Sequence, residues 1–322
     1  LEYTLNQPET FWNSKTTNGV LMPINGEFLE SKGDDFGQPG DVKSILYNGP
    51  FLLKSITSKS EITFEKNEEY WDKDNVHINK IKLSYFDGSD QDSLARAFSD
   101  GSYTQARLFP ASSNFASVEE KYKDNIYNTQ PGAGVAVFGF NIDRQAYNHT
   151  SKTSDEQKSS TNKAILNKNF RQAITFALNR ENYSAQVNGK EYAKAAIRNM
   201  YTAPAFVQVN GKDFGDVVAD KLQTYGDQWS GVNLADSQDG LYNKDKAKAQ
   251  FEKAKAELQK EGVQFPIHLD VPVVQSSTSF VARMQSFKQS VEDTLGTENV
   301  VVDLQMMDQD AILNITINVP PA

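Results

Sequence analysis

The sequence predicts an α/β fold, and two observations support this prediction. First, hydrophobic residues make up 38% and aromatic residues 11% of the 322 residues, which is typical of a chain that buries a core. Second, the second half of the chain alternates amphipathic segments of helix length with apolar runs of strand length. There, a predicted helix over residues 278–295 separates predicted strands over 266–274 and 300–305. This order indicates a parallel crossover unit, which we expect to be right-handed.

Residues 167–187, near the middle of the chain, predict one long helix that buries one face. Asn167 or Asn169 can cap its start by accepting a backbone N–H, and Asn188-Gly189 tolerates positive φ after its end. Its apolar positions recur every three or four residues and are Phe170, Ile174, Ala177 and Leu178. Periodicity alone gives this helix no role beyond the core.

Other elements follow from the same periodicities. A second long helix is expected over residues 244–262, where Asn243 can cap the start and Gly262 can end the helix. Its apolar face consists of Ala247, Phe251, Ala254 and Leu258. Before residue 44 the chain is expected to be irregular. The remaining expected elements are an extended run within 41–57, strands over 61–66 and 80–86, a helix ending near residue 100 and a short helix over 213–222.

Two segments between these elements have distinct compositions. Residues 134–142 form a continuous apolar run, which predicts a strand buried on both faces, and their glycines permit close backbone approach. Residues 148–162 are rich in Ser, Thr and Lys and have no periodicity, so we expect a flexible surface insertion that separates the two halves of the chain.

Charge and composition exclude several classes of protein. The net charge of -9 and the pI near 5.0, without any basic run, oppose binding to nucleic acid. The chain has no cysteine, which removes disulfides and thiolate chemistry, and no apolar run approaches the roughly 18 residues of a membrane span. It opens at Leu1 and closes with an apolar run and Pro-Pro-Ala, so we expect both ends to be cut from a longer protein.

Catalytic and metal-binding motifs find little support in the sequence. The three histidines lie in unrelated contexts, and His268 lies within a predicted strand, where a structural role is expected. Neither a Gly-x-Ser-x-Gly elbow nor a phosphate-binding glycine loop occurs, and the acidic residues of 87–92 do not follow the order of a calcium loop. The paired glutamates at 68–69 and 119–120 lie in polar stretches. We therefore expect a binding protein without cofactor or metal rather than an enzyme.

Five ordered motifs then carry a resemblance that covers nearly the whole chain. They are Gly49-Pro50-Phe51-Leu52-Leu53, Lys66-Asn67-Glu68-Glu69-Tyr70-Trp71, Phe140-Asn141, Phe170-Arg171-Gln172-Ala173-Ile174, and Leu241-Tyr242-Asn243-Lys244-Asp245. This series resembles the oligopeptide class of bacterial extracellular solute-binding proteins (family 5), and it is similar to the streptococcal lipoproteins of the Ami/Ali type.

The resemblance implies a function, a place and a fold. The function is capture of oligopeptides, by main-chain hydrogen bonding in a cleft between lobes, for the permease subunits of an ABC importer at the extracellular face of the cell membrane. The fold is periplasmic-binding-protein-like and two-lobed, with mixed sheets and hinge-crossing strands, and is expected to be incomplete in this chain. Residues 1–133 would belong mostly to the first lobe and 134–322 mostly to the second. We expect a monomer, and two alternatives stay open: a surface peptide sensor or adhesin on this fold, and a hydrolase with an unrecognised carboxylate site.

This sequence also departs from the family pattern. The lipid-anchoring cysteine and a downstream Gly-Trp, Asp-Tyr and Pro motif, whose aspartate meets the peptide amino group in the family, do not occur here. No residue of this chain is therefore assigned that anchoring role, and membrane attachment would depend on a lipid anchor outside the chain.

Contact residues for the peptide are hypotheses that follow from the resemblance. A strand over residues 137–141 would cross between the lobes, a segment near residue 200 would line the cleft, and the start of the helix after 277 would favour an anionic terminus. The proposed residues are Phe138, Gly139, Phe140, Asn141, Arg198, Asn199, Tyr201, Gln275, Ser276 and Ser277. The alternatives are core packing for the phenylalanines, a surface ion pair for Arg198 and a helix cap for the serines.

Overall fold

A computed structural model describes residues 3–127, 137–200, 202, 206–232, 234 and 241–316. The chain divides into two compact units, Leu1–Phe86 and Asp87–Ala322. Each unit is described by itself. The expected division into lobes near residue 133 stays a prediction about the longer protein.

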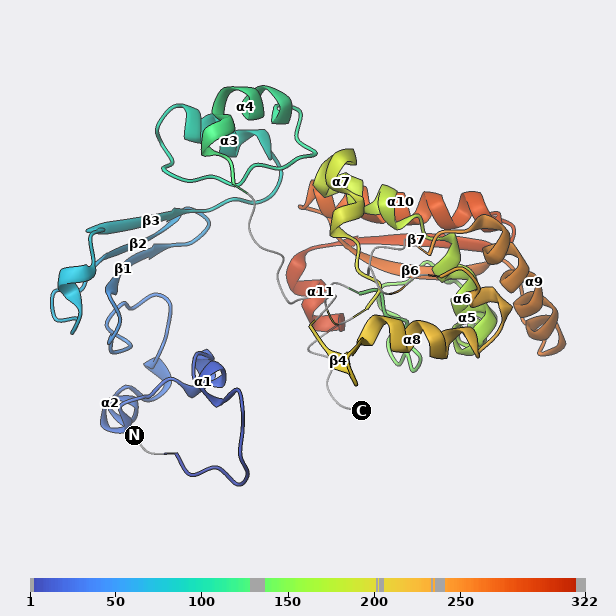
Figure 1. Ribbon diagram of the computed structural model, residues 1–322, viewed down its shortest axis with the longest axis horizontal. Helices are drawn as coiled ribbons and strands as arrows, with labels where there is room; N and C mark the ends of the chain where they lie inside the picture. Colours follow the sequence, from blue (N-terminus) through green and yellow to red (C-terminus); the bar gives the residue numbers. More distant parts are fainter. Residues whose placement is uncertain are drawn as a thin grey trace. The chain divides into compact units, whose positions relative to one another are not determined.

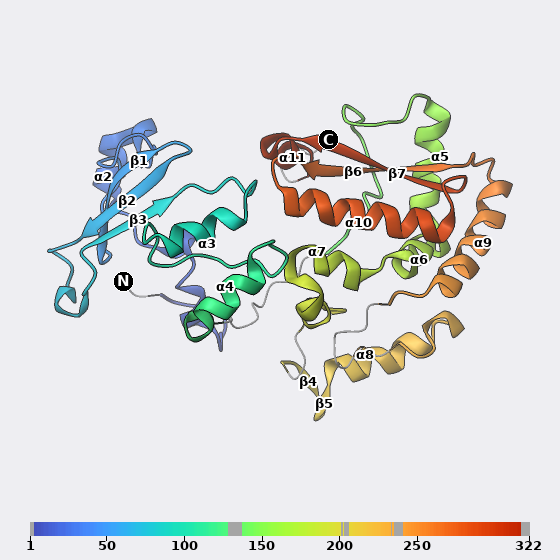
Figure 2. The same ribbon diagram turned by 90° about the horizontal axis from the view of Figure 1, so that it is seen from above.

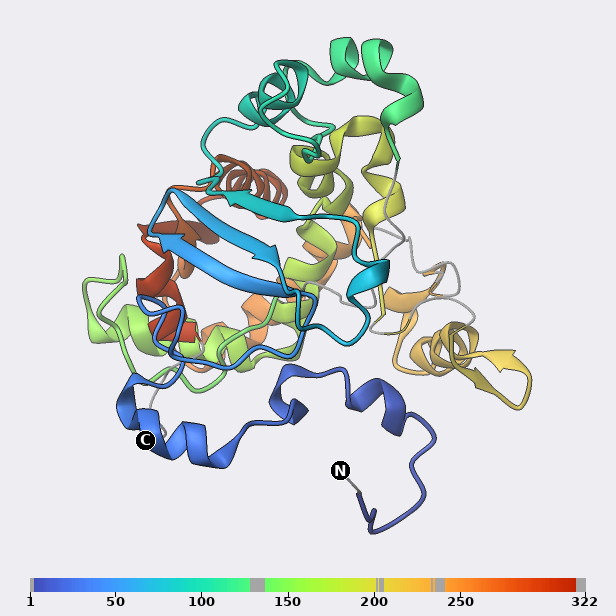
Figure 3. The same cartoon turned by 90° about the vertical axis from the view of Figure 1, so that its left-hand side faces the viewer.

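The first unit contains a three-stranded antiparallel sheet in the order β1-β2-β3 (Figure 3). Asn67 closes one end of the β1–β2 hairpin, since its side-chain amide donates to the Gly49 carbonyl at 2.8 Å and its backbone N–H donates to Pro50 at 2.9 Å. These are residues of the first two motifs of the sequence, and their contacts stabilise the hairpin. The elements are α1 (Trp12–Lys15), α2 (Gly26–Lys32), β1 (Phe51–Thr57), β2 (Glu61–Lys66) and β3 (Lys80–Ser84), with short 3-10 turns at Gly19–Leu21, Gly33–Asp35 and Lys73–Asn75.

The second unit is mainly helical and contains a parallel pair of strands (Figures 1 and 2). Its helices are α3 (Asp92–Ser99), α4 (Phe115–Tyr122), α5 (Asp155–Leu166), α6 (Lys168–Ala177), α7 (Arg180–Tyr192), α8 (Phe214–Gln223), α9 (Lys244–Lys260), α10 (Thr278–Leu295) and α11 (Gln309–Thr316). Its strands are β4 (Gln208–Val209), β5 (Lys212–Asp213), β6 (Ile267–Val274) and β7 (Val300–Met307), and 3-10 turns lie at Lys123–Asn125, Lys194–Ala196 and Asp227–Trp229.

The core of the second unit lies where α6, α9 and α10 pack with one face of the β6–β7 pair. Phe170 on α6 and Phe251 on α9 are almost completely buried, and their ring centroids are 6.4 Å apart. The four apolar residues expected on the face of α9 are all buried, and Asn243 caps this helix by accepting the Lys246 N–H at 2.9 Å. The predicted parallel arrangement of the strands that flank α10 is confirmed.

The two outer edges of the β6–β7 pair differ, since the β6 edge carries a proline and the β7 edge bonds to side chains of α10. Ile267 donates its N–H to Asn299, directly before β7, and Gln275, just after β6, donates to Met307 of β7. This pattern places the N–H and C=O groups of the even-numbered residues of β6, including Pro272, on the outer edge. A proline at such a position costs no ladder hydrogen bond. On β7, the backbone N–H of Val302 donates to the Glu292 carboxylate at 2.8 Å, and its carbonyl accepts from the Lys288 ammonium at 2.7 Å.

The single long helix expected over 167–187 is wrong, because the chain forms two helices. Asn167 caps α6 as expected, but Leu178 is extended and Asn179 caps α7 by accepting the Asn182 N–H. The break is stabilised by Ser290 of α10, whose hydroxyl donates to the Ala177 carbonyl at 2.6 Å and accepts from the Asn179 N–H at 2.8 Å. This partner lies more than a hundred residues away in sequence, so local periodicity does not reveal the break.

The flexible insertion expected over 148–162 is also wrong, because α5 begins within it. Ser154 caps α5 by accepting the Gln157 N–H, and the Gln157 side chain accepts the N–H of Thr153, the residue before the cap, at 2.7 Å. Ser160 and Thr161 are buried, where Thr161 donates to the His268 carbonyl of β6. Polar residues therefore fix this helix to the sheet, and the absence of apolar periodicity misled the prediction.

The strand expected over 134–142 is not present in its described part. Residues 137–142 have no regular secondary structure, while residues 134–136 lie outside the described residues. A strand needs a neighbour for its backbone hydrogen bonds, and no strand in the described ranges pairs with this segment. The expected burial on both faces is also absent, because Phe140 contacts the core while Val137 and Ile142 are mostly exposed.

We predict that Phe251→Ala lowers the free energy of unfolding by about 3–5 kcal/mol, because the substitution leaves a cavity at the α6–α9 contact. The measurement is chemical denaturation followed by circular dichroism. Lys253→Ala, on the exposed side of α9, is the matched control and is expected to change stability by less than about 0.5 kcal/mol. Equal effects of the two substitutions would contradict the assigned core.

Candidate functional site

The segment that contains Phe138, Gly139, Phe140 and Asn141 packs partly on α7 and α10. The Phe138 ring is stacked on Phe287 with centroids 5.0 Å apart and meets the Tyr183 ring edge-on at 5.4 Å, yet 46% of Phe138 stays exposed. Asn141 accepts the Asp143 N–H, which forms a local turn. Of these four residues, Phe138 is therefore the one that offers an exposed aromatic surface beside two helices.

Arg198 and Asn199 lie in the loop after α7, and their environments differ. Arg198 donates to the carbonyls of Ala195 and Ile197 at 2.8 and 2.7 Å, so its guanidinium stabilises its own loop. Asn199 accepts from Arg180 of α7 at 3.1 Å, while its buried amide nitrogen has no acceptor among the described residues. Tyr201, the third residue predicted here, lies outside the described residues.

Gln275, Ser276 and Ser277 connect β6 to α10. Ser277 is the N-cap of α10 and accepts the Phe280 N–H, and the backbone N–H of Gln275 donates to Met307 at 2.9 Å. Gln275 and Ser276 are exposed. The cap that the sequence offered as the alternative for Ser277 is thus present, and ligand contact by these three residues stays a prediction.

Sequence reasoning missed the residues of α7 and α10 that surround Phe138. The Arg283 guanidinium lies 5.6 Å from the Tyr183 ring centroid and 5.4 Å from that of Phe280, within the range of cation–π attraction. Burial raises the pKa of the Tyr183 hydroxyl, and the charge of Arg283 opposes this rise. The Nε atom of Arg283 is buried without a hydrogen-bond partner in the described structure. The sequence contains one signal for this cluster: Phe280, Arg283 and Phe287 are three and four residues apart, which places them on one face of α10.

We call this cluster the α7–α10 face and define it by Arg180, Tyr183, Phe138, Asn199, Phe280, Arg283 and Phe287. It combines guanidinium and amide donors with aromatic rings. Such groups bind acceptors, including carbonyl and carboxylate oxygens, and apolar side chains. Two of the predicted residues, Phe138 and Asn199, belong to it.

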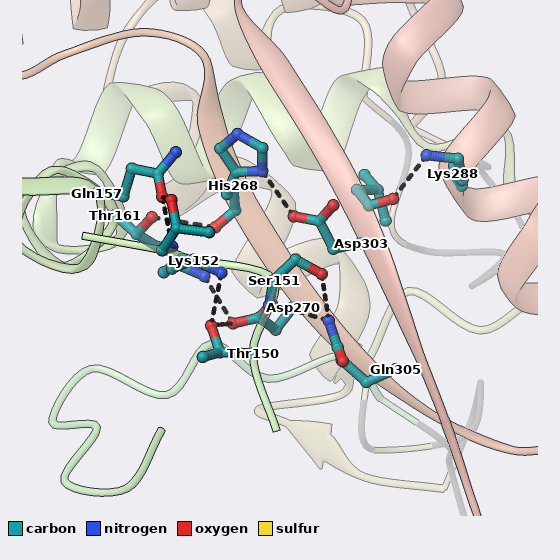
Figure 4. Close-up of polar contacts among 12 residues, drawn as sticks. Thr150, Ser151, Lys152, Gln157, Thr161, His268, Asp270, Lys288, Asp303 and Gln305 are labelled. Carbon is teal, nitrogen blue, oxygen red and sulfur yellow. Dashed lines mark hydrogen bonds and ion pairs between the residues drawn. The ribbon is translucent and has the colours of Figure 1, made fainter. Parts of the chain in front are cut away.

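A second polar cluster lies on the opposite side of β6, around the carboxylate of Asp270 (Figure 4). Lys152 donates to this carboxylate at 2.6 Å and Arg144 at 2.5 Å, and the side chains of Lys152 and Asp270 are 0% and 4% exposed. Further donors are Thr150 at 2.7 Å, the Ser151 N–H at 3.0 Å and Gln305 at 3.1 Å. The carboxylate thus attaches the segment that follows Asn141 to the sheet.

The pKa of Asp270 reflects this surplus of donors. Burial raises the pKa, but the hydrogen bonds from Lys152, Ser151, Arg144 and Thr150 outweigh burial and lower the pKa to about 2. For Lys152, burial has the larger effect and lowers the pKa of the ammonium, although Asp270 opposes the change. A carboxylate with so low a pKa and so many donors is a poor general base. Its role is structural.

His268 lies on the same side of β6 and contacts Asp303 of β7 through Nδ1 at 2.8 Å. This contact joins the two strands and gives His268 the structural role expected from the sequence. Across the ranges that the structure describes, no three His, Cys, Asp or Glu side chains come together as a metal site. Within those ranges, none of the helices combines the length and apolarity needed to cross a membrane.

Comparison with known proteins relates the chain to one family. The family model of the bacterial extracellular solute-binding proteins, family 5 (middle), matches residues 1–317. The oligopeptide-binding protein AmiA of Streptococcus pneumoniae is 62% identical over 316 residues, which cover 98% of this chain and 48% of AmiA. The oligopeptide-binding protein SarA of Streptococcus gordonii is 60% identical over 316 residues, with the same two shares. The chain therefore spans about half the length of these curated relatives.

Solved structures show the same fold at low sequence identity. OppA of Listeria monocytogenes bound to peptide has a TM-score of 0.61 at 19% identity, over 97% of this chain and 52% of OppA. The murein tripeptide binding protein MppA of Escherichia coli has a TM-score of 0.63 at 16% identity, over 96% of this chain and 50% of MppA. The predicted α/β fold class of periplasmic binding proteins is confirmed, over about half of those chains.

We predict that Asp270→Asn destabilises the protein by about 3–5 kcal/mol, because the substitution leaves the buried Lys152 ammonium without its counter-charge. The measurement is the free energy of unfolding in urea at pH 7. Asp303→Asn is the matched control on the same side of the sheet. It removes the same charge but keeps an acceptor for His268, so we expect a loss below about 1.5 kcal/mol. A loss for Asp270→Asn no larger than the loss for the control would contradict the structural role assigned to Asp270.

The same carboxylate predicts a pH dependence of stability. Its folded-state pKa of about 2 lies below the ordinary value of 3.8, so its contribution is complete above pH 4 and is lost as the pH falls toward 2. The contribution is about 2 kcal/mol. The difference between the unfolding free energies of the wild type and Asp270→Asn, measured from pH 7 to pH 2, should therefore shrink by about 2 kcal/mol as the pH falls below 4. A constant difference between the two proteins over this range would refute the prediction.

Proposed function

Because the chain belongs to the bacterial extracellular solute-binding proteins, family 5, we propose that it is part of a receptor that binds oligopeptides outside the cell for an ABC importer. The ligand class follows from the names of the curated relatives, which are oligopeptide-binding proteins. The proposed receptor binds without catalysis. It acts as a monomer, held at the extracellular face of the membrane by a lipid anchor outside this chain and in contact with the permease subunits of the importer.

The observation that best supports peptide binding is the set of unused donors on the α7–α10 face. The buried atoms Arg283 Nε and Asn199 Nδ2 have no acceptor among the described residues, and a buried donor without a partner costs about 1–3 kcal/mol. A peptide carries carbonyl oxygens along its whole main chain, and these are the acceptors that such donors lack. Because both atoms are buried here, a peptide reaches them only if the side chains move on binding. The exposed ring of Phe138 offers contact area for a side chain of the peptide.

The proposed contact residues follow from this placement. Phe138 and Asn199 have the strongest support, since they contact α7 or α10 directly. Gly139, Asn141, Gln275 and Ser276 are exposed next to these elements and stay in the proposal. Phe140, Arg198 and Ser277 have packing or hydrogen-bonding roles in the structure, so their proposed contribution is to hold the segments that contact the peptide.

The expected result is that the full-length protein, purified without denaturation, releases a mixture of small peptides intact in native mass spectrometry. It should also bind a synthetic peptide from that mixture in titration calorimetry. A protein that releases no peptide and binds none from a mixed library would overturn the proposed function. Hydrolysis of the bound peptides would instead support the hydrolase alternative.

We also predict that Phe138→Ala weakens peptide binding about tenfold, since a lost aromatic contact of about 1.4 kcal/mol corresponds to that factor. The control is Phe206→Ala, which removes another exposed phenylalanine, just before β4. Calorimetric titration of both variants with one peptide measures the difference. Equal affinity of the two variants would remove Phe138 from the site.

A further inference from the structure

The chain contains five Asn-Gly pairs, and the structure places them in different environments. An asparagine followed by glycine is prone to lose its side-chain amide, because glycine has no Cβ that hinders attack by its backbone nitrogen on the asparagine Cγ atom. In a folded protein, this attack depends on how freely the two residues move. The pairs are Asn18-Gly19, Asn25-Gly26, Asn48-Gly49, Asn188-Gly189 and Asn210-Gly211.

In the first two pairs, the asparagine side chain is held as a helix cap. Asn18 accepts the Val20 N–H at 3.1 Å, and Asn25 accepts the Phe28 N–H at 2.9 Å. Such a cap fixes the side chain and keeps the asparagine backbone in the extended conformation that begins a helical turn. Attack on Cγ therefore requires that the cap first be broken.

Two further pairs are held by their surroundings. Asn188 lies within α7 and donates to the Ser184 hydroxyl at 3.0 Å. The glycine that follows it packs so closely on Pro110 that a Cβ there would lie 3.0 Å from the Pro110 carbonyl oxygen. In Asn48-Gly49, the glycine carbonyl accepts from the Asn67 side chain at 2.8 Å. Both pairs are thus held in place by neighbouring residues.

Asn210-Gly211 forms the two-residue turn between β4 and β5. Both residues are exposed and have positive φ, 52° and 77°, as a type I′ turn requires. Neither the Asn210 side chain nor Gly211 forms a hydrogen bond with the described residues, and a Cβ at Gly211 would meet no atom within 4 Å. A hairpin with so few residue pairs is only marginally stable, so this turn opens easily.

We infer that Asn210 is a site of spontaneous deamidation in the folded protein. The Gly211 backbone nitrogen loses its proton and attacks Cγ of Asn210. The bond between Cγ and the side-chain nitrogen then breaks, and this nitrogen leaves as ammonia with the proton. One water molecule opens the resulting cyclic imide. Opening at Cγ gives aspartate, and opening at the backbone carbonyl of residue 210 gives isoaspartate.

Both products change the hairpin. Aspartate adds a negative charge two residues before Lys212, which already forms an ion pair with Asp220. Isoaspartate adds one carbon to the main chain inside the turn. Because loop length determines the geometry of a hairpin turn, we expect the isoaspartate form to lose the pairing of Val209 with Lys212. The modification thus acts on β4 and β5, and it does not depend on the proposed function.

The test compares the folded full-length protein with the same protein unfolded in urea. Both samples are incubated at pH 7 and at pH 8.5 and then digested. Mass spectrometry with chromatographic separation measures the aspartate and isoaspartate products at each Asn-Gly pair. The unfolded sample gives the reference rate of each pair without structure. The variant Asn210→Gln removes the proposed site, and Asn48→Gln is the matched control at another exposed asparagine.

In the folded protein, we expect Asn210 to react at least about tenfold faster than Asn188, because attack within a helix requires local unfolding. This advantage should disappear in urea, and the reaction should be faster at pH 8.5 because the attacking nitrogen must lose its proton. Asn210→Gln should remove the main product of the folded protein, whereas Asn48→Gln should leave it unchanged.

Two results would overturn the inference. The first is a folded protein in which Asn210 reacts no faster than Asn188 and the two capping asparagines. The second is a rate at Asn210 that rises by more than about tenfold on unfolding, since the turn would then protect the pair by its local stability. Both results are independent of whether the protein binds peptide.

Discussion

The ionic contact at Asp270 is the interaction on which the second unit most depends. Its carboxylate is held between the Lys152 and Arg144 side chains on one side of β6, while Ile267 and Leu269 of the same strand pack into the core on the other. Isolated strands of this kind are weakly stabilised by their own hydrogen bonds. The strand is therefore fixed from both sides, by apolar burial on one and by charge on the other.

The consequence for function is positional. The contacts of Asp270 hold the segment that follows Asn141. Packing on the core side orients α10, and this helix places Ser290 and Arg283 against α7. Ser290 fixes the start of α7 by bonding to the break that precedes it, and Arg283 then lies against the Tyr183 ring. The α7–α10 face is thus formed by two helices whose relative placement is set by buried polar contacts rather than by apolar packing alone.

Local sequence signals predicted the elements whose stabilising partners are nearby in the chain. The caps Asn243 and Asn167 can be predicted from sequence because a cap bonds to an N–H only three residues later, as both residues do in the structure. The break at Leu178 and the polar helix α5 were missed, since one depends on Ser290 and the other on contacts from its polar residues to β6. The α7–α10 face could not be predicted for the same reason, because the contact between Arg283 and Tyr183 joins residues far apart in the sequence.

Most residues of the family motifs have structural roles, and only Phe140 and Asn141 among them are also proposed to contact the ligand. Asn67 and Gly49, which belong to the most specific motifs, bond to each other and close a hairpin. Phe170 and Asn243 are a core residue and a helix cap. Roles of this kind serve the fold, whatever ligand the protein binds. Similarity across the motifs therefore does not by itself transfer a ligand preference.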